Sequence, residues 1–417
     1  MFALIDANSF YCSCERAFDP RLRGKPVVAL SNNDGCAIAR TNEAKDLGIK
    51  MGAPWHLIKG QPELRHVIAK SSNYSLYADM SRRIYEVLIG FGEEVEPYSI
   101  DEMFIDTREV YDRDKFGCAL RRRVLKVAKI PCCVGFGPTK TIAKLANRLA
   151  KADREGSGVC DLSDRSERDE LYRSIPVGEV WGIGSAAVKK LEKIGVETVA
   201  DFVALPESIV RELLTVTGLR TVSELKGLAC LSLATQPGPK KSLAVTRSFG
   251  RAISRREDLE EAVIYYATRA AERLRGHGLI AGALQVFITT NPFSKTDRQY
   301  GNSITLGLEP SNDTFVVVGA ARQALEALWC DGYRYAKAGI VLLDLEAQDS
   351  AAGSMFPSRD PAKSAVLMQA LDGVNRRYGR LALRPGSLTN RPVWAMRRGN
   401  LSPSYTTRLS DILKARA

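Results

Sequence analysis

Histidine is scarce in this chain, and its cysteines are not grouped. Only three histidines occur among the 417 residues, and His56, His66 and His277 lie far apart. The nine cysteines include no Cys-x-x-Cys pair. Because zinc sites draw on clustered cysteine and histidine ligands, this composition argues against a zinc site. Scattered thiols in odd number are typical of a reduced cytoplasmic protein.

The chain also lacks a long apolar run. No stretch approaches the roughly 18 apolar residues that a membrane-spanning helix requires. The first residues are apolar, but they include Asp6 and carry no basic leader, so they do not read as a signal peptide. We therefore expect a cytoplasmic protein with no membrane partner.

Acidic residues are the minority charge. There are 48 Asp and Glu against 60 Lys and Arg, which gives a net charge of +12 and a pI near 9.2. Between Arg121 and Arg154 the only acid is Asp153, and the residues after 390 are similarly basic. A basic excess of this kind favours a polyanionic partner such as nucleic acid. For the Arg121–Arg123 cluster, a solvent-facing helix is an equally good interpretation.

Length and periodicity together predict several domains, roughly two to four. Over residues 1–165 strands alternate with helices, which predicts an α/β core. We expect strands at 1–11, 27–30 and 132–136, and helices at 39–47, 74–91 and 139–150. Residues 170–230 change to short helices separated by glycine turns, without strand patterns.

Two further segments have recognisable patterns. The sequence VWGIG at 180–184, followed by two short helices, is typical of a helix-hairpin-helix, whose exposed amides grip phosphate, although a packing hairpin has the same pattern. After the basic linker at 237–241, strands and helices are expected in the order β-α-β-β-α-β. From residue 347 the periodicity is lost until a helix near 362–378.

Three acids stand at the ends of expected strands. Asp101 and Glu102 interrupt the apolar run 96–106, and Asp6 ends the apolar first strand. Adjacent carboxylates repel each other unless a cation lies between them, so the pattern predicts a magnesium site. Three carboxylates from two strands suit a two-metal displacement at phosphorus, with ions about 3.5–4 Å apart. Taken singly, each acid also fits a solvated loop.

A set of motifs, in order along the whole chain, carries a resemblance to a known family. They are LSNNDGC at 30–36, EAK at 43–45, SNY at 72–74, YSIDE at 98–102, KTIAKLAN at 140–147, VWGIG at 180–184, RSFG at 247–250 and LSPSYTTR at 401–408. In these motifs the chain resembles the Y-family translesion DNA polymerases and, among them, the UmuC-type catalytic subunits of bacterial DNA polymerase V.

The resemblance implies an α/β multidomain fold of the right-hand polymerase type. The palm would comprise 1–17 and 76–168, the fingers 18–75, the helical thumb with its helix-hairpin-helix 169–236, and the β-α-β-β-α-β little finger 237–346. Residues 347–417 would be a C-terminal tail for partner contacts. The implied activity is template-directed, error-prone insertion of dNTPs opposite and past damaged bases in the SOS response to DNA damage.

The same resemblance implies the site residues. Asp6, Asp101 and Glu102, with the carbonyl of Ala7, would hold two Mg²⁺ ions. The dNTP would be contacted by Phe10, Tyr11, Lys45 and Lys151. Lys140 and Lys144 are expected to face the duplex or the palm surface. Asn42 departs from the tyrosine of many relatives, as it does in the UmuC branch.

Two of these residues are aromatic and have competing interpretations. Tyr11 would be a steric gate against a ribose 2′-hydroxyl, with core packing as the alternative. For Phe10, packing is the preferred interpretation.

Nucleic-acid and protein partners are implied as well. Gly182, Gly184 and Lys189 of the hairpin, and Arg247 and Ser248 on an edge-like strand, would contact the primer–template DNA. A UmuD-type dimer and a RecA filament would be protein partners. In the tail, Met355 and Phe356 resemble the end of a sliding-clamp peptide, although its glutamine is missing.

Two other functions fit part of the sequence. A non-catalytic DNA-binding scaffold would keep the fold, but it would have no reason to keep three mutually repelling acids. A nucleotidyl cyclase would share paired acids and a palm-like core, but the helix-hairpin-helix and the second basic module favour a long polymer. Salt-dependent binding to primer–template separates the DNA-binding proteins from a cyclase, because a cyclase should show little of it.

Overall fold

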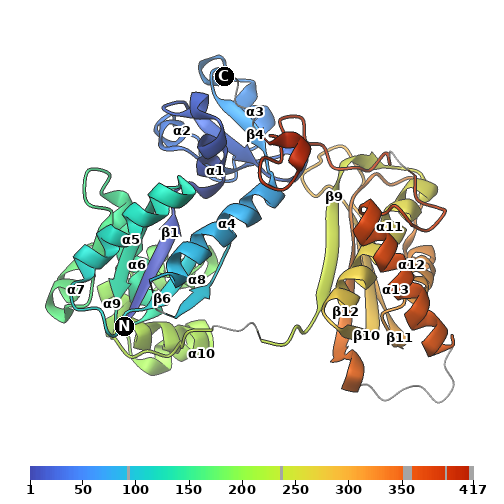
Figure 1. The fold of residues 1–417 in the computed structure, drawn as a ribbon. Helices are drawn as coiled ribbons and strands as arrows, with labels where there is room; N and C mark the ends of the chain where they lie inside the picture. Colours follow the sequence, from blue (N-terminus) through green and yellow to red (C-terminus); the bar gives the residue numbers. More distant parts are fainter. Residues whose placement is uncertain (92–93, 235–237, 351–358, 390–391, 413–417) are drawn as a thin grey trace. The chain divides into compact units, whose positions relative to one another are not determined.

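The computed structural model describes residues 1–91, 94–234, 238–350, 359–389 and 392–412 (Figure 1). They form two compact units, of which the first combines Met1–Pro237 with Gly399–Ala417 and the second is Gly238–Arg398. The chain therefore builds the first unit, leaves it for the second, and returns to the first. Among the helices that can be described, none is long and apolar enough to cross a membrane.

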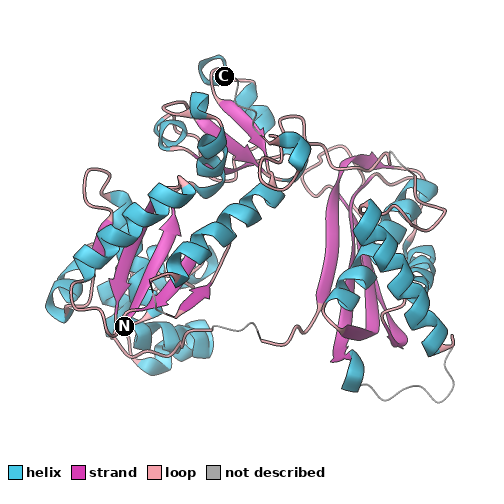
Figure 2. Cartoon of the chain, viewed as in Figure 1, coloured by secondary structure: helices cyan, strands magenta, loops and turns pink. Residues whose placement is uncertain are grey.

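A five-stranded sheet organises the first unit (Figure 2). Its strands lie in the order β5 (Val95–Pro97), β6 (Glu102–Asp106), β1 (Phe2–Ala7), β7 (Cys132–Gly137) and β8 (Val159–Asp161). The central strand β1 is antiparallel to both β6 and β7. The predicted strands that carry the three acids are thus neighbours in one sheet.

The two faces of this sheet are covered by different helices. Ala3, Ile5 and Ala7 of β1 pack in one cluster with α4 (Tyr74–Ile89) and α5 (Arg113–Ala128). Phe2 and Leu4 point to the opposite face. There they meet Ala143 of α6 (Lys140–Ala152) and Phe104 of β6. Because successive side chains of a strand alternate between faces, Asp6 and Glu102 lie on the α6 side.

Glycine brings α6 close to the sheet. A Cβ at Gly135 of β7 would lie 2.1 Å from the backbone nitrogen of Asn147 and 2.4 Å from the carbonyl oxygen of Ala143. Only a residue without a side chain permits this approach. The amide of Asn147 then donates to the carbonyls of Leu4 (3.1 Å) and Cys133 (2.8 Å), which ties the helix to two strands.

A second, three-stranded sheet lies beside α1 (Phe10–Phe18) in the same unit. Its order is β3 (Ala37–Arg40), β2 (Val27–Leu30) and β4 (Ile68–Ser71), with α2 (Asn42–Asp46) and α3 (Trp55–Lys59) packed near it. The predicted helix at 39–47 is therefore wrong at its start, where the chain is still in β3. The predicted strand at 1–11 is too long, because β1 ends at Ala7 and Ser9, in the left-handed conformation, starts α1.

Helices make up the rest of the first unit up to residue 234. They are α7 (Arg165–Leu171), α8 (Ser185–Glu192), α9 (Val199–Ala204) and α10 (Glu207–Leu225). The two short helices expected after the VWGIG motif are confirmed as α8 and α9. Helix α10 is longer than expected, although Thr215 interrupts it with a φ of 63°.

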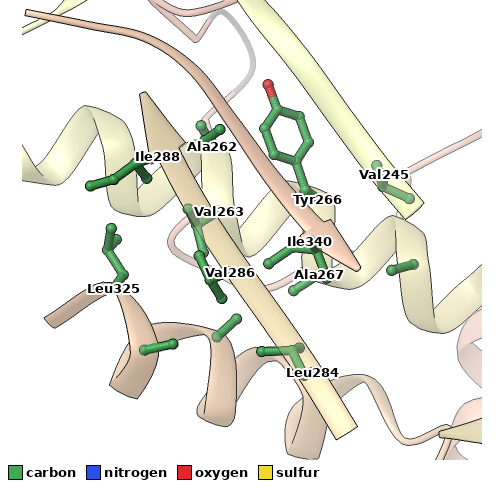
Figure 3. Close-up of a cluster of buried hydrophobic side chains, with 14 of the residues drawn as sticks. Val245, Ala262, Val263, Tyr266, Ala267, Leu284, Val286, Ile288, Leu325 and Ile340 are labelled. Atoms are coloured by element: carbon green, nitrogen blue, oxygen red, sulfur yellow. The ribbon is translucent and has the colours of Figure 1, made fainter. Parts of the chain in front are cut away.

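The second unit has the predicted β-α-β-β-α-β order. It runs β9 (Leu243–Ile253), α11 (Arg256–Gly276), β10 (Leu279–Thr290), β11 (Gly301–Ser311), α12 (Thr314–Leu328) and β12 (Tyr335–Ala347). The sheet order is β11-β10-β12-β9, so β9 is an edge strand. Residues such as Val263, Val286 and Leu325 fill the core between the helices and the sheet (Figure 3).

The chain after β12 is more structured than its lack of periodicity suggested. The helix expected near 362–378 is confirmed as α13 (Pro361–Tyr378), with Met368 and Leu371 buried. An ion pair of 2.7 Å between Arg275 of α11 and Asp372 fixes α13 to the second unit. Beyond Arg398 the chain rejoins the first unit, which the sequence did not predict.

Candidate active site

The three predicted acids converge at one end of β1 and β6. Asp6 and Glu102 are direct partners in the antiparallel register. The backbone amide of Ala7 donates to the carbonyl of Asp101 (2.9 Å), and the Ser99 hydroxyl donates to the Asp101 carboxylate (2.7 Å). Like charges directly opposite each other on a sheet destabilise it unless they are compensated. The structure brings the three together and requires a source of positive charge.

Helix α6 supplies that charge as a row of lysines. Lys140, Lys144 and Lys151 lie on one face, because four and eleven residues correspond to nearly whole turns of an α-helix. They pair in order with Glu96 of β5, Glu102 of β6 and Asp6 of β1. The Lys144 ammonium is 2.8 Å from each oxygen of Glu102.

This row corrects one expectation. Lys140 and Lys144 were predicted to face the duplex or the palm surface, and for Lys140 that prediction is wrong. Lys140 is buried, with its ammonium held by Glu96 and the Ser232 carbonyl (2.7 Å). The Lys144 ammonium points to the acids and also lies 4.5 Å from the centre of the Tyr98 ring. The spacing of the lysines is consistent with a shared face of α6, but it does not show the direction in which that face points.

Electrostatics at Asp6 reflect this crowding. Burial raises the pKa of the Asp6 carboxyl to about 6, and the nearby Glu102 and Asp101 add to the rise, while Lys151 opposes it. In the part of the chain described, no three His, Cys, Asp or Glu side chains are grouped closely enough to hold a metal ion. The acids are instead held separately, by Lys151, Lys144 and Ser99. Their all-oxygen donor set nevertheless suits a hard divalent cation such as Mg²⁺.

A cavity of about 260 Å³ is lined by both lysines predicted to bind the nucleotide, and one of them, Lys151, is the ion-pair partner of Asp6. Lys45 of α2 and Lys151 of α6 line it together with Asn8, Ser13 and Asn42, among others. Burial lowers the pKa of Lys45, and the charges of Arg40, Lys151 and Arg154 lower it further. Two cations that disfavour each other at close range make this cavity suited to an anion.

Asn8 is a candidate that the sequence analysis missed. Its side chain lies at the end of β1, and its amide donates to the sulfur of Cys133 (3.3 Å). The carboxamide oxygen of Asn8 is buried without a hydrogen-bond partner. A buried acceptor of this kind costs free energy until a ligand or water donates to it. The signal in the sequence was its place two residues after Asp6.

The two aromatic residues at the start of α1 have different surroundings. Phe10 is 3% exposed and belongs to the core, so the preferred interpretation of packing is confirmed. Tyr11 is only half-buried. Burial, the nearby Tyr74 and the Asp101 charge raise the pKa of the Tyr11 hydroxyl. Tyr11 lies in the chain between Ser9 and Ser13, which both line the cavity.

The residues predicted to grip DNA in the first unit lie around the start of α8. Gly184 is the N-cap of α8, Gly182 has a φ of +90°, and Lys189 is exposed on the same helix. Val180 and Ile183 anchor the motif in the core, which leaves the two glycines on the surface. This exposure is compatible with phosphate binding and with a packing hairpin.

The surroundings of the Arg121–Arg123 cluster on α5 favour the interpretation of a solvent-facing helix. The Arg121 side chain donates to the carbonyl of Cys132 (2.7 Å), so it fastens α5 to β7. Arg122 and Arg123 are exposed to solvent. None of these contacts points to a ligand.

In the second unit, Arg247 and Ser248 lie on β9, and the expectation of an edge strand is confirmed. The guanidinium of Arg247 donates to the carbonyl of Thr246 (2.8 Å), and Ser248 is exposed. Met355 and Phe356 lie outside the described residues, so the clamp contact stays a prediction.

Comparison with family models gives matches over most of the chain. Residues 5–148 match the impB/mucB/samB family, and residues 240–355 match the C-terminal domain of that family. Residues 365–415 match a domain of unknown function, DUF4113.

Whole relatives resemble the chain along its full length. Protein UmuC of Salmonella typhimurium is 43% identical over 423 residues, covering 100% of both chains. Protein MucB of Escherichia coli is 40% identical over 98% of this chain and 97% of its own length. DNA polymerase IV 1 of Bacillus subtilis is 27% identical over 92% of each.

A solved structure shares the fold. A chimeric Y-family DNA polymerase superposes with a TM-score of 0.65, at 19% identity, over 82% of this chain and 99% of its own. The predicted multidomain α/β fold is therefore confirmed as the fold of that class.

Proposed function

The chain belongs to the impB/mucB/samB family, and from that premise we propose that it is a template-directed, error-prone DNA polymerase that inserts dNTPs opposite and past damaged bases. The observation that carries the proposal is the juxtaposition of Asp6 with Glu102 across β1 and β6, beside a cavity lined by Lys45 and Lys151. Acids next to an anion-sized cationic cavity are what nucleotidyl transfer requires.

The acids would hold the metal. Asp6, Asp101, Glu102 and the carbonyl of Ala7 are the ligands proposed for two Mg²⁺ ions. When bound, such ions activate the primer 3′-hydroxyl and neutralise charge on the leaving pyrophosphate. The pKa of Asp6 is raised by burial and by the nearby Glu102 and Asp101 despite Lys151, so a divalent cation would favour its charged form further.

The lysines would change partners in that state. An ammonium and a metal ion compete for the same carboxylate oxygens, so Lys144 would leave Glu102 and Lys151 would leave Asp6 if these acids held Mg²⁺. Lys151, which lines the cavity with Lys45, would then bind the triphosphate. Ser99 keeps Asp101 oriented through its hydroxyl.

Tyr11 would read the sugar. Tyr11 stands at the start of α1, between Ser9 and Ser13 of the cavity lining, and a ribose 2′-hydroxyl would meet its ring where a deoxyribose does not. The buried neighbour Phe10 supports the backbone behind it.

The palm, fingers, thumb and little finger of the polymerase class would correspond to the boundaries expected from the sequence. In the thumb, Gly182, Gly184 and Lys189 would contact DNA phosphates, and in the little finger Arg247 and Ser248 would do so. Contacts of this kind give affinity without sequence choice, which suits an enzyme that works at any damaged position.

Protein partners follow from the family. We propose that the chain works in the cytoplasm during the SOS response, with a UmuD-type dimer and a RecA filament. A sliding-clamp contact through Met355 and Phe356 stays a prediction. Each of the nine cysteines is a free thiol, which suits that compartment.

The experiment that tests this function is primer extension opposite an abasic site with Mg²⁺. The full chain is assayed alone, with a UmuD-type dimer, and with the dimer and a RecA filament. We expect extension past the lesion in at least one of these mixtures, and its loss when EDTA is added. DNA binding without extension in every mixture would favour the non-catalytic scaffold.

A further inference from the structure

Three tyrosine rings, those of Tyr11, Tyr74 and Tyr77, are packed together at the start of α1 and α4. The ring of Tyr11 stacks on that of Tyr77, with centroids 4.5 Å apart and an angle of 14° between planes. Tyr74 meets both rings edge-on, at 6.0 and 6.3 Å. Tyr77 is fully buried in α4. The plane of the Tyr11 ring is therefore defined by a residue that itself cannot touch the nucleotide.

A buried carboxylate fixes Tyr77 in turn. Its hydroxyl donates to Glu15 of α1 (2.8 Å), and Glu15 is 1% exposed. A second hydroxyl, that of Ser402, donates to the same carboxylate oxygen (3.0 Å). A carboxylate that is buried away from water is stabilised by hydrogen-bond donors of this kind. The loss of one donor leaves a buried carboxylate oxygen with fewer hydrogen bonds, which costs free energy.

Ser402 comes from the far end of the chain, and the segment around it is bound along its length. The backbone of Asn400 exchanges hydrogen bonds with Ser71 at the end of β4 (3.0 and 2.9 Å). The Asn73 amide donates to the carbonyls of Ser402 and Pro403 (3.2 Å each). The ring of Tyr405 stacks on Phe18 of α1, at 4.9 Å.

Asn73 links this segment to the helix of the tyrosines. Its side-chain oxygen caps α4 by accepting from the amide of Leu76 (3.3 Å), while its nitrogen holds the C-terminal segment. The segment therefore contacts α4 at its cap, through Asn73, and at its first turn, through Glu15 and Tyr77.

We infer that the C-terminal segment Gly399–Tyr405 is a positioning element of the nucleotide site: Ser402, acting through Glu15 and Tyr77, sets the plane of the Tyr11 ring and so sharpens the choice of deoxyribonucleotides over ribonucleotides. The inference rests on the proposed function, in which Tyr11 reads the sugar. It gives a role to part of the stretch 365–415 that matches a domain of unknown function.

The physical reason is that a steric gate works over small displacements. A ring that moves by about 1 Å no longer collides with the extra hydroxyl, and positioning errors of this size change rates by orders of magnitude. Supporting residues that lock a ring through packing and hydrogen bonds keep such a gate in place. The stacked face of Tyr11 has that support only while Tyr77 stays bonded to Glu15.

The test compares insertion of a dNTP and the matching rNTP on one undamaged primer–template, as a ratio of kcat/KM values. Ser402→Ala removes one donor to Glu15, and Tyr77→Phe removes the other but keeps the ring. For both variants we expect the ratio to fall by about tenfold, the effect of one hydrogen bond to a charged group. Ser364→Ala, which removes a serine–carboxylate bond to Asp313 in the second unit, is the matched control and leaves the ratio unchanged.

A merely structural role gives a different result. Loss of stability lowers insertion of both nucleotides equally, so an unchanged ratio in Ser402→Ala and Tyr77→Phe overturns the inference. A second readout does not depend on catalysis. Hydrogen exchange of residues 11–16 and 74–80 should be at least several-fold faster in Ser402→Ala than in wild type, and equal exchange would also overturn it. A wild-type chain that inserts neither nucleotide refutes the proposed function instead. In that case hydrogen exchange alone decides whether the segment Gly399–Tyr405 holds α1 and α4 in place.

Discussion

Asp6 of β1 stands directly opposite Glu102 of β6, and each of these carboxylates is paired with a lysine of α6. Two acids at adjacent positions of one sheet face would repel each other strongly without these partners. The lysines supply the positive charge that a divalent cation would supply in the proposed reaction.

Without bound metal, the free energy of unfolding should depend on pH through Asp6. A carboxyl whose pKa is about 6 when folded and 3.8 when unfolded binds more protons in the folded state between these values. Its contribution to folding is therefore present below about pH 4 and is lost as the pH rises through 6. In wild type this pH effect should lower the free energy of unfolding by about 2–3 kcal/mol at pH 7. In EDTA, Asp6→Asn should not show this decrease, because asparagine does not titrate.

Urea unfolding of wild type and Asp6→Asn at pH 4.5 and pH 7 provides the measurement. The variant should gain stability relative to wild type at pH 7 more than at pH 4.5. A difference between the two proteins that is equal at both pH values would contradict the account of Asp6.

The two cavity lysines should act on nucleotide binding. Lys45→Ala and Lys151→Ala each remove a cation from the cavity, and a charge-assisted bond to phosphate contributes about 1.5–3 kcal/mol. Steady-state insertion should show KM for the dNTP raised by about 10- to 100-fold. Lys59→Ala, an exposed lysine of α3, is the control. An unaltered KM in both cavity variants would remove these residues from the site.

Residues proposed to contact DNA phosphates should contribute to the salt dependence of DNA binding. Lys189→Ala and Arg247→Ala should weaken binding to primer–template equally for all sequences. Each should reduce the slope of log K against log salt by about 1, because one phosphate contact is lost. Fluorescence anisotropy at several salt concentrations measures both quantities. Lys363→Ala on α13 should leave the slope as in wild type, and a similar slope in all three variants would speak against the contacts.

The approach of α6 to the sheet should not tolerate a side chain. Gly135→Ala places a Cβ 2.1 Å from the backbone of Asn147, so α6 and its lysine row must move away from β7. Overpacking against backbone should cost about 3 kcal/mol or more. Thermal unfolding compares it with Gly60→Ala, where the new Cβ meets only an ordinary contact of 3.5 Å. Equal melting temperatures would show that the helix has room to adjust.

Local patterns in the sequence were sufficient for much of the fold. Alternating strands and helices predicted both α/β units, and the β-α-β-β-α-β order of the second unit needed no correction. The acids at 6, 101 and 102 could be grouped because each ended or began an apolar strand. One error in element type fell on residues 39–40, where a single residue, Thr41, separates β3 from α2.

Relationships between distant segments could not be predicted in the same way. The spacing of Lys140, Lys144 and Lys151 gives a common helix face, but the direction of that face depends on how Gly135 and Asn147 pack α6 on the sheet. Ser402 and Glu15 are separated by 387 residues, and no periodicity connects them. Contacts of that kind arise from tertiary packing, which a single sequence read locally does not contain.

The central claim is that Asp6, Asp101 and Glu102 perform metal-dependent nucleotidyl transfer. The most direct measurement is Mg²⁺-dependent primer extension by wild type, Asp101→Ala and Asp106→Ala, with the partners that the wild type requires. Asp106 ends the same strand β6 but pairs with Arg108 away from the site, so it controls for loss of a carboxylate. We predict that Asp101→Ala abolishes extension, lowering it by about 10³-fold or more, while it still binds primer–template. Asp106→Ala should extend as wild type does. Extension by Asp101→Ala at the wild-type rate would contradict the account.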